Sequence, residues 1–258
     1  MELDCKVALI TGASRGIGLA IARRCASAGM AVALVARDPE RLAAARGTLP
    51  KEAPAMTIQA DLRDKASART VISRCCESLG LPDFLVNNAG TAPSEKFENT
   101  SDDQLEEVLD LHLKASFRLL RELTPAWKSR SSGAALQVAS SAGLRGYAFT
   151  AAYTSAKHAM LGLTRALAAE WEGSSLRIGA ICPGFVDTDI TRESARKIAA
   201  RGKQSAEQAL LRMGAMNRIG RLHTTDEVAD AAWRFLTDPV FGKSGAIWDL
   251  DSESPRLA

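Results

Sequence analysis

Short apolar runs alternate with longer amphipathic segments along the chain. Seven of the runs have the length and composition of strands: Val7–Ile10, Ala31–Ala36, Met56–Ala60, Phe84–Val86, Ala134–Val138, Leu176–Ile181 and Ala246–Leu250. Successive positions within these runs are apolar, so both faces of each strand are expected to be buried. That pattern is typical of a parallel sheet that lies between two layers of helices.

Segments with a helical period lie between the predicted strands. They are Ile17–Ala28, Pro39–Leu49, Lys65–Leu79, Asp102–Trp127, Ala151–Trp171 and Asp226–Leu236. Two of them begin with capping boxes, Ser101-x-x-Gln104 and Thr224-x-x-Glu227. The alternation implies right-handed crossovers and an α/β fold of the Rossmann type, a doubly wound parallel sheet flanked by helices. We see no linker, repeat or low-complexity tract, and therefore expect a single domain over residues 1–258.

Composition narrows the class of protein. Of the 258 residues, 46% are hydrophobic, which is enough for a large core, and the net charge is only +3. That charge predicts no general affinity for nucleic acid. No apolar run approaches the roughly 18–20 residues that span a bilayer, so no membrane partner is expected. The acidic start, Met1-Glu2-Leu3-Asp4, precedes a strand almost directly, which argues against a secretory signal and favours the cytoplasm.

The cysteines predict neither disulfides nor a metal site. They are Cys5, Cys25, Cys75, Cys76 and Cys182. Since they form no Cys-x-x-Cys pair and no His/Cys ligand spacing, we interpret them as reduced packing residues of a cytoplasmic protein, with no metal.

A glycine-rich stretch follows the first predicted strand: Thr11-Gly12-Ala13-Ser14-Arg15-Gly16-Ile17-Gly18. A turn of this kind lets the backbone approach a ligand, and the helix that follows offers free N–H groups to a phosphate. The spacing Gly-x-x-x-Gly-x-Gly differs from the usual dinucleotide fingerprint, and the absence of Gly-Lys-Ser/Thr excludes a P-loop. A tight turn without a ligand is the alternative.

Two arginines near this turn predict which dinucleotide binds. Arg15 lies within the turn, and Arg37 lies just past the second strand, where an acidic residue would hold a ribose 2′-hydroxyl. Ala36 supplies no carboxylate, and two guanidiniums suit a 2′-phosphate, so NADP(H) is predicted over NAD(H). Solvated surface arginines are the alternative, with Asp38 pairing with Arg37 or capping the next helix.

Tyr153 and Lys157 are four residues apart on a predicted helix and therefore share a face. The ammonium is expected to favour the phenolate, and an oxidised nicotinamide would add a second positive charge. Lowering a tyrosine pKa from about 10 by about three units needs about 4 kcal/mol. Ser140 ends a strand at the same edge of the sheet as the glycine turn and is predicted to bind a substrate carbonyl oxygen. Without the glycine turn, an ordinary helix surface would explain the Tyr/Lys pair.

Together these motifs resemble the short-chain dehydrogenase/reductase family, in particular its 3-oxoacyl-acyl-carrier-protein reductases, over essentially the whole chain. The matching residues are Thr11–Gly18, Asp61-Leu62, Asn87-Asn88-Ala89-Gly90, Ser140, Tyr153-x-x-x-Lys157 and Pro183-Gly184 followed by Thr188. The resemblance implies a sheet of seven parallel strands, with a cofactor half of about residues 1–130 and a catalytic and substrate half of about residues 131–258. It also implies a homotetramer, with the long helices Asp102–Trp127 and Ala151–Trp171 as subunit contacts.

The resemblance also implies roles for individual residues. Ser140 would orient the substrate, Tyr153 would be the acid/base, and Lys157 would bind the nicotinamide ribose and lower the tyrosine pKa. The full set of expected cofactor contacts, which includes Tyr153 and Lys157, is Gly12, Ser14, Arg15, Gly16, Ile17, Gly18, Arg37, Asp61, Leu62, Asn88, Ala89, Gly90, Tyr153, Lys157, Pro183, Gly184, Val186 and Thr188.

The chain departs from the family pattern at two places. His112 replaces an asparagine that is thought to hold a water in the proton relay through the lysine. An imidazole that titrates near pH ~6.5 would hold that water or join the relay as a catalytic residue; a core histidine with a rerouted relay is the alternative. After Asp251 the chain has Ser252-Glu253 where many members have two glycines, which affects the expected local subunit contacts.

The segment of about residues 187–221 is predicted to be a lid over the substrate. Its basic residues exceed its acidic residues by four, more than the whole chain's net charge of +3. A basic lid favours a substrate bound to a phosphate-bearing acyl carrier, such as coenzyme A or the acidic acyl carrier protein. The alternative is an amphipathic helix with a solvated charged face. Apolar lid residues would contact an aliphatic or alicyclic group: Ile190, Ile198, Leu210, Leu211, Met213 and Met216.

Three functional hypotheses follow. The first is an NADP(H)-dependent oxidoreductase (EC 1.1.1.-) that acts on a small-molecule carbonyl or secondary alcohol, with a 3-oxoacyl thioester as substrate. The second has the same mechanism but a non-thioester alicyclic or steroid-like substrate. The third is a non-catalytic dinucleotide-binding member.

Overall fold

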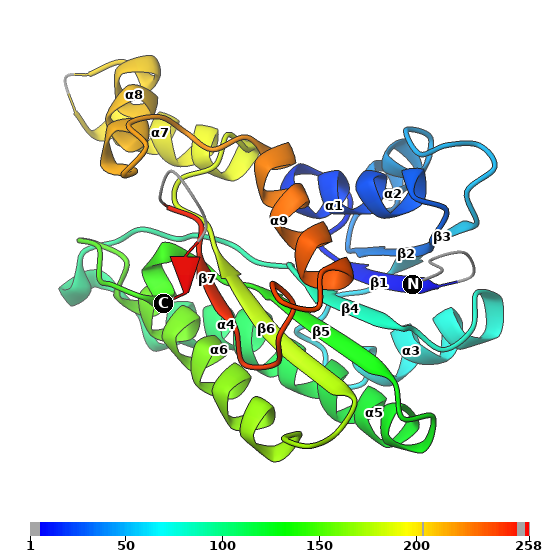
Figure 1. Ribbon diagram of the computed structural model, residues 1–258. Helices are drawn as coiled ribbons and strands as arrows, with labels where there is room; N and C mark the ends of the chain where they lie inside the picture. Colours follow the sequence, from blue (N-terminus) through cyan, green and yellow to red (C-terminus); the bar gives the residue numbers. More distant parts are fainter. Residues whose placement is uncertain (1–5, 203, 252–255, 258) are drawn as a thin grey trace.

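The computed structural model describes residues 6–202, 204–251 and 256–257. One sheet runs through the molecule in the strand order β3-β2-β1-β4-β5-β6-β7-β8 (Figure 1). Its strands are β1 (Val7–Thr11), β2 (Ala31–Ala36), β3 (Ala55–Gln59), β4 (Phe84–Asn87), β5 (Gly133–Val138), β6 (Leu176–Cys182), β7 (Ile247–Asp249) and β8 (Arg256–Leu257). The first seven strands are parallel, which confirms the predicted doubly wound sheet.

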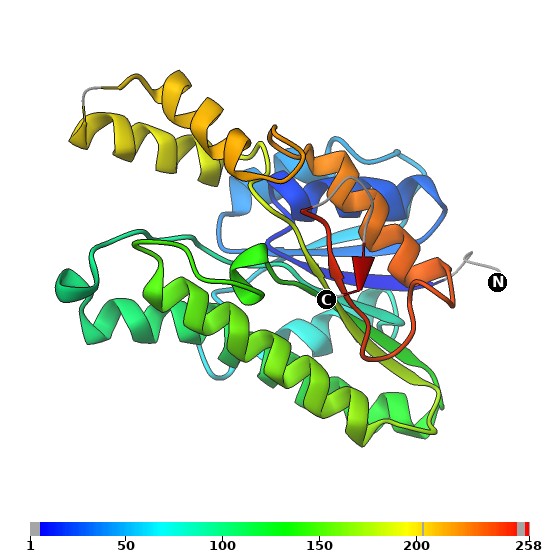
Figure 2. The same ribbon diagram turned by 60° about the vertical axis from the view of Figure 1, so that its left-hand side comes forward.

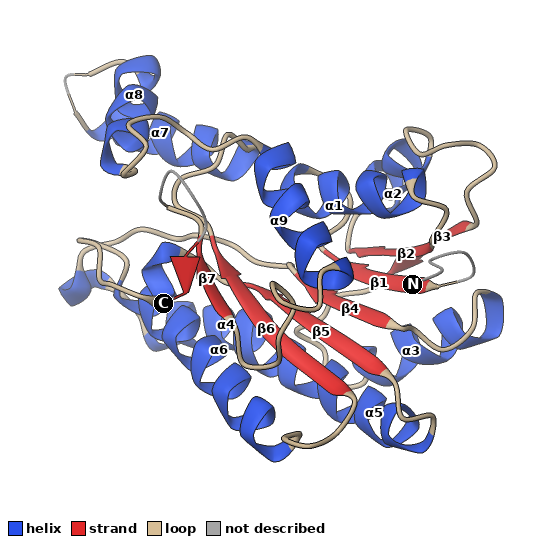
Figure 3. Cartoon of the chain, viewed as in Figure 1, coloured by secondary structure: helices blue, strands red, loops and turns tan. Residues whose placement is uncertain are grey.

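Helices cover both faces of the sheet (Figures 1 and 3). One face carries α1 (Gly16–Ser27), α2 (Pro39–Arg46) and α9 (Thr225–Thr237). The other carries α3 (Ser67–Ser78), α4 (Asp102–Leu109), α5 (Ala115–Ser129) and α6 (Ala151–Glu170). The helices α7 (Asp189–Arg201) and α8 (Ala206–Met216) form an arm that projects from the body (Figure 2).

The continuous apolar runs produce a separate core on each face. Along β1, Ala8 and Ile10 pack against the layer of α1 and α9, whereas Val7 and Leu9 pack against the layer of α3 and α5. This division follows from the two-residue period of a strand. Every residue of β1 is buried, as expected for a central parallel strand.

The predicted helix Asp102–Trp127 is wrong in one respect, because it is interrupted. A π-helical turn, η2 (Asp110–Lys114), separates α4 from α5. Such a turn shifts the backbone hydrogen bonds by one residue and is frequent at functional sites. Here it contains His112, which is 2% exposed.

Other differences concern the ends of elements and the arm. The segment predicted as Pro39–Leu49 ends as a helix at Arg46, and β8 pairs antiparallel with β7 as an addition to the seven expected strands. Both predicted capping boxes are confirmed. A third, formed by Ser205 and Gln208 at the start of α8, was missed.

Some of the predictions concern residues outside the described part of the chain. These are the acidic start Met1–Asp4, Cys5, Lys203 of the lid, and Ser252-Glu253. The four described cysteines are free thiols. Within the described ranges, no helix has both the length and the apolar character needed to cross a membrane.

Candidate active site

The predicted site residues follow the carboxyl ends of neighbouring strands. The glycine turn follows β1, Asn88 follows β4, Ser140 follows β5 and Pro183 follows β6. The strand order reverses between β1 and β4, where open parallel sheets bind their ligands. The fold therefore gathers at one edge residues that lie far apart in the sequence.

Close backbone contacts explain the glycines of the turn. Gly12 and Gly16 have φ values of 64° and 56°, a left-handed region that disfavours other residues. A Cβ at Gly18 would lie 2.4 Å from the Gly12 carbonyl oxygen and 2.5 Å from Asn88 Nδ2. The turn thus keeps its backbone bare at the start of α1, as the pyrophosphate of a dinucleotide requires.

Asn88 holds the glycine turn in place. Its Nδ2 donates to the Thr11 carbonyl oxygen at 2.9 Å, and its backbone N donates to Thr11 Oγ1 at 2.9 Å. The Ala89 backbone N also donates to Thr11 Oγ1, at 3.0 Å. Thr11, which the sequence analysis did not single out, therefore joins the ends of β1 and β4. Asn88 was predicted to line the cofactor site, and its described contacts give its amide a supporting role.

The adenine end of the expected cofactor site is organised by Arg63. Its guanidinium forms a bidentate ion pair with Asp61, the shortest distance being 2.6 Å. The hydrogen bond from Arg63 holds the pKa of Asp61 below its usual value, and Arg37 adds a smaller effect in the same direction. Arg37 itself is exposed, and Leu62 is buried. Arg63 was missed because nothing in its spacing marks it as functional.

Arg15 connects the glycine turn to the arm. It is the N-cap residue of α1, and its Nη1 lies 3.1 Å from Asp189 Oδ2 at the start of α7. Thr188, the N-cap of α7, lies over the same turn, because its Cγ2 is 3.5 Å from the position of a Cβ at Gly16. The start of α7 thus lies against the glycine turn at Gly16.

Ser140, Tyr153 and Lys157 lie together. Ser140 Oγ accepts the Ala142 N–H at 3.1 Å and is hydrogen-bonded to Tyr153. Lys157 Nζ donates to the Val138 carbonyl oxygen at 2.9 Å and lies 5.7 Å from the centroid of the Tyr153 ring. Tyr153 is half-buried and Lys157 is 3% exposed.

The charge states of this group differ from the sequence-based expectation. Burial raises the pKa of Tyr153, and the hydrogen bond with Ser140 opposes this only in part. Burial also lowers the pKa of Lys157 to about 7. A lowered tyrosine pKa was predicted from the neighbouring ammonium together with the positive charge of an oxidised nicotinamide. The protein alone does not produce it, because the same burial that brings the two groups together disfavours both of their charged forms.

His112 contacts the loop that follows β4. Its Nε2 lies 2.8 Å from the carbonyl oxygen and 3.1 Å from the N of Thr91, and its ring meets Tyr153 edge-on at 5.5 Å. A Cβ at Gly90 would lie 2.3 Å from the imidazole. Burial, and then the charge of Lys157, lower the pKa of His112 well below 6.5. The imidazole is therefore neutral at neutral pH.

The loop after β6 connects the arm to the loop after β5, which contains Ser140. The Pro183 carbonyl oxygen accepts the Ser141 N–H at 2.8 Å, and Val186 forms a parallel bridge with His223. A Cβ at Gly184 would lie 2.3 Å from Asn217 Oδ1. Asn217 is a second residue that the sequence analysis missed.

Four of the basic residues in the predicted lid, residues 187–221, pair with acids. Arg192 pairs with Asp187 at 2.8 Å, Lys197 with Glu193 at 3.0 Å, and Arg218 with Asp249 at 3.1 Å. Two of the acids that neutralise this region, Asp249 and Glu227, lie beyond residue 221. The tertiary structure thus weakens the positive field that the local composition predicted.

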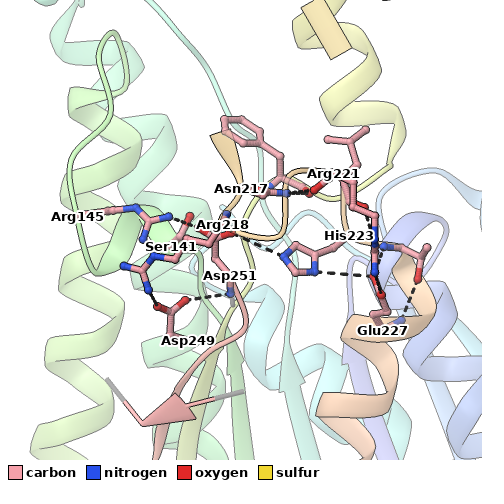
Figure 4. A network of polar contacts seen from close by, with 12 residues as sticks. Ser141, Arg145, Asn217, Arg218, Arg221, His223, Glu227, Asp249 and Asp251 are labelled. Atoms are coloured by element: carbon pink, nitrogen blue, oxygen red, sulfur yellow. Dashed lines mark hydrogen bonds and ion pairs between the residues drawn. The ribbon is translucent and has the colours of Figure 1, made fainter. Parts of the chain in front are cut away.

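A polar network links the arm to the loop after β5 (Figure 4). Asp251 is completely buried and pairs with Arg145, while its Oδ1 accepts the backbone N–H of Arg218 at 2.9 Å. His223 lies 3.9 Å from Asp251 and 3.8 Å from Glu227. Of these residues, only Arg218 was part of the predicted lid, and the others were not predicted to belong to the site.

The doubly wound sheet, the bare glycine turn and the Ser140–Tyr153–Lys157 group define a class of protein, the dinucleotide-dependent α/β oxidoreductases. The family described as short chain dehydrogenase matches residues 6–199. The chain belongs to this family and is an oxidoreductase.

Relatives with assigned activities cover most of the chain. A 3beta-hydroxysteroid dehydrogenase from Mediterraneibacter gnavus is 35% identical over 209 residues, 80% of this chain and 75% of that protein. A solved variant of actinorhodin polyketide ketoreductase with NADPH has a TM-score of 0.90 at 29% identity, covering 95% of both chains. Levodione reductase has a TM-score of 0.91 at 27% identity, covering 96% and 97%.

Proposed function

We propose that the protein transfers a hydride reversibly between NADP(H) and a carbonyl or secondary alcohol. The observation that carries the proposal is the contact between Ser140, Tyr153 and Lys157 at the sheet edge that also holds the bare glycine turn. The NADPH named with the actinorhodin ketoreductase supports the choice of cofactor.

The residues around the turn fit a dinucleotide. The glycine turn with Ser14 and Ile17 would take the pyrophosphate, Asp61 and Leu62 the adenine, and Arg15 and Arg37 the 2′-phosphate. The nicotinamide end would meet Ala89, Gly90, Pro183, Gly184, Val186 and Thr188. When bound, the cofactor supplies or accepts the hydride.

The polypeptide supplies binding and proton transfer. Ser140 donates a hydrogen bond to the substrate oxygen, and Tyr153 gives its proton to that oxygen in reduction and removes it in oxidation. The raised pKa of Tyr153 keeps the phenol protonated at neutral pH, which suits the reductive direction. With a pKa of about 7, Lys157 is still about half protonated at neutral pH, and its ammonium form, 5.7 Å from the ring, stabilises the phenolate that remains after proton transfer.

Turnover of a carbonyl panel with NADPH tests the proposal. We expect Tyr153→Phe to lower kcat by at least about 100-fold, the size of a lost general acid, while NADPH binding is retained. NADPH binding without turnover of any carbonyl by the wild type would favour a non-catalytic member.

The preference for NADPH over NADH is tested at Arg37. A charged hydrogen bond contributes about 1.5–3 kcal/mol, so Arg37→Ala should raise the KM for NADPH about tenfold or more and leave that for NADH unchanged. Arg41→Ala is the matched control, since Arg41 is exposed and pairs with Asp38. A wild-type preference for NADH would contradict the assignment.

Two substrate classes have support. The polyketide ketoreductase favours a ketone on an acyl carrier or thioester, and the hydroxysteroid dehydrogenase favours an alicyclic alcohol or ketone. The pairing of four basic residues of the segment 187–221 with acids weakens the case for recognition of an acyl carrier by charge. A lower KM for a 3-oxoacyl thioester than for its truncated ketone, measured at low salt, would select the first class; equal values would select the second.

A further inference from the structure

Asp251 is a charged residue with no exposed surface at the end of the sheet (Figure 4). Its Oδ2 pairs with Arg145, its Oδ1 accepts the Arg218 N–H at 2.9 Å, and its own backbone N donates to Asp249 Oδ1 at 3.0 Å. A buried carboxylate is tolerated only with such partners, because an unpaired charge in the interior is very costly.

One branch of the network reaches the catalytic loop. Arg145 Nε donates to Tyr147 Oη at 2.9 Å, and Tyr147 Oη lies 2.8 Å from Ser141 Oγ. Ser141 follows Ser140 directly, and its backbone N donates to the Pro183 carbonyl oxygen at 2.8 Å. The Arg145–Asp251 ion pair therefore holds the loop after β5, here called the catalytic loop, which places Ser140 next to Tyr153.

The other branch reaches the base of the arm, the two segments around Phe185 and Asn217 that connect α7 and α8 to the body. Asn217 precedes Arg218 and binds both backbone groups of Phe185, with 2.7 Å from the Phe185 N to Oδ1 and 2.8 Å from Nδ2 to the Phe185 carbonyl oxygen. The Phe185 ring packs edge-on against Tyr147 at 6.0 Å. The two branches thus meet again beside the catalytic loop, on the side where the arm begins.

We propose that Asp251 and Arg145 are positioning residues that hold the loop of Ser140 and the base of the arm in one geometry for the substrate. The proposal rests on the proposed function. Neither residue touches the glycine turn in the described contacts, so the pair acts on the substrate side and not on cofactor binding.

The test compares Arg145→Met and Arg145→Lys with the wild type. We expect Arg145→Met to lower kcat/KM for the carbonyl at least about tenfold, with the dissociation constant for NADPH within about twofold of wild type. Amide hydrogen exchange should accelerate in both residues 140–150 and residues 184–223. Arg145→Lys keeps a cation for Asp251 and should recover most of the loss. Arg24→Met is the matched control, because it breaks an exposed Arg–Asp pair between α1 and α9 and should change neither measurement.

Unchanged kcat/KM and unchanged exchange in folded Arg145→Met would overturn the proposal. So would an equal loss of NADPH binding, which would indicate a general loss of structure. If Arg145→Met does not fold, Asp251→Asn is judged by the same criteria. A wild type that binds NADPH but reduces no carbonyl would contradict the proposed function instead, and the exchange of the two segments would still decide whether the pair couples them.

Discussion

Burial sets the protonation of Tyr153 and Lys157 before any ligand is considered. Lys157 is buried and Tyr153 is half-buried, and burial raises the pKa of the phenol and lowers the pKa of the ammonium. The sequence could bring the two residues to one helix face, but it could not show the depth of the site, on which the direction of the pKa shift depends.

The lowered pKa of Lys157 predicts a stability change with pH. Between its folded pKa of about 7 and its usual pKa of 10.5, the unfolded chain binds one more proton than the folded chain. The free energy of unfolding of the cofactor-free protein should therefore rise with pH from about 7 to about 8.5, by up to about 1.4 kcal/mol per pH unit. Urea unfolding at several pH values measures this.

The matched variant for this prediction is Lys157→Met, which should flatten the slope. Between about pH 7 and about pH 8.5, the other groups with shifted pKa values contribute little to the slope. The pKa values of His112 and His223 lie below 6.5, and the raised thiol pKa values act only above their usual value of 9.0, with the opposite sign. An equal slope in both proteins would contradict the assigned pKa.

His112 is predicted to contribute to the reaction rate without changing its protonation state between about pH 6 and about pH 9. Because its pKa lies well below 6.5, the pH profile of kcat/KM should keep its shape between about pH 6 and about pH 9 in His112→Asn. The shorter side chain loses the contact with Thr91, so the rate should fall several-fold. If a limb of the profile near pH 6.5 disappeared in the variant, the imidazole would be a proton carrier in the relay.

At the scale of elements, the same substitution, glycine to alanine, can be compared in the glycine turn at Gly18 and in helix α6 at Gly162. Gly18→Ala places a Cβ 2.4 Å from a backbone oxygen, so the turn must open, and NADPH binding should weaken at least about tenfold. Gly162 lies exposed in α6 with no atom within 4 Å of the added Cβ. Gly162→Ala should stabilise the protein by about 0.5–1 kcal/mol and leave NADPH binding unchanged.

Titration of nicotinamide fluorescence and thermal unfolding measure both effects. Equal NADPH affinities for Gly18→Ala and the wild type would mean that the turn does not cradle the cofactor.

The elements were predictable where one repeating pattern governed them. The run Ala31–Ala36 predicted the bounds of β2 without error, because a buried strand leaves a continuous apolar segment. The π-helical turn around His112 was not predictable, since a one-residue shift of backbone bonds hardly alters the hydrophobic stripe. The arm was predicted only as a lid, and the bounds of α7 and α8 came from the structure.

At the scale of the whole molecule, we propose that the chain assembles as a homotetramer. Phe117 on α5 is 47% exposed, and the Arg121 guanidinium lies 5.8 Å from its ring centroid, in a region predicted to contact another subunit. Light scattering after size exclusion should give about four times the 27.5 kDa chain mass. Phe117→Asp should shift the protein toward smaller species, because burying an unpaired carboxylate at an interface is costly.

Val240→Asp is the control for assembly, since Val240 is 81% exposed and lies after α9, away from α5. A wild type of 27.5 kDa in solution would rule out the assembly.

The sequence by itself determined the doubly wound sheet and the glycine turn, and it predicted that Ser140, Tyr153 and Lys157 lie together. These depend on periodicity and on short spacings, which are local in the chain. Only the tertiary structure decided that burial keeps Tyr153 and His112 uncharged and lowers the pKa of Lys157 to about 7. It also decided that four basic residues of the segment 187–221 pair with acids, and that Asp251 joins the arm to the loop after β5. Charge states and ion pairs depend on burial and on partners that lie far away in the sequence, 106 residues for Arg145 and Asp251 and 174 residues for Arg15 and Asp189, which no local pattern encodes.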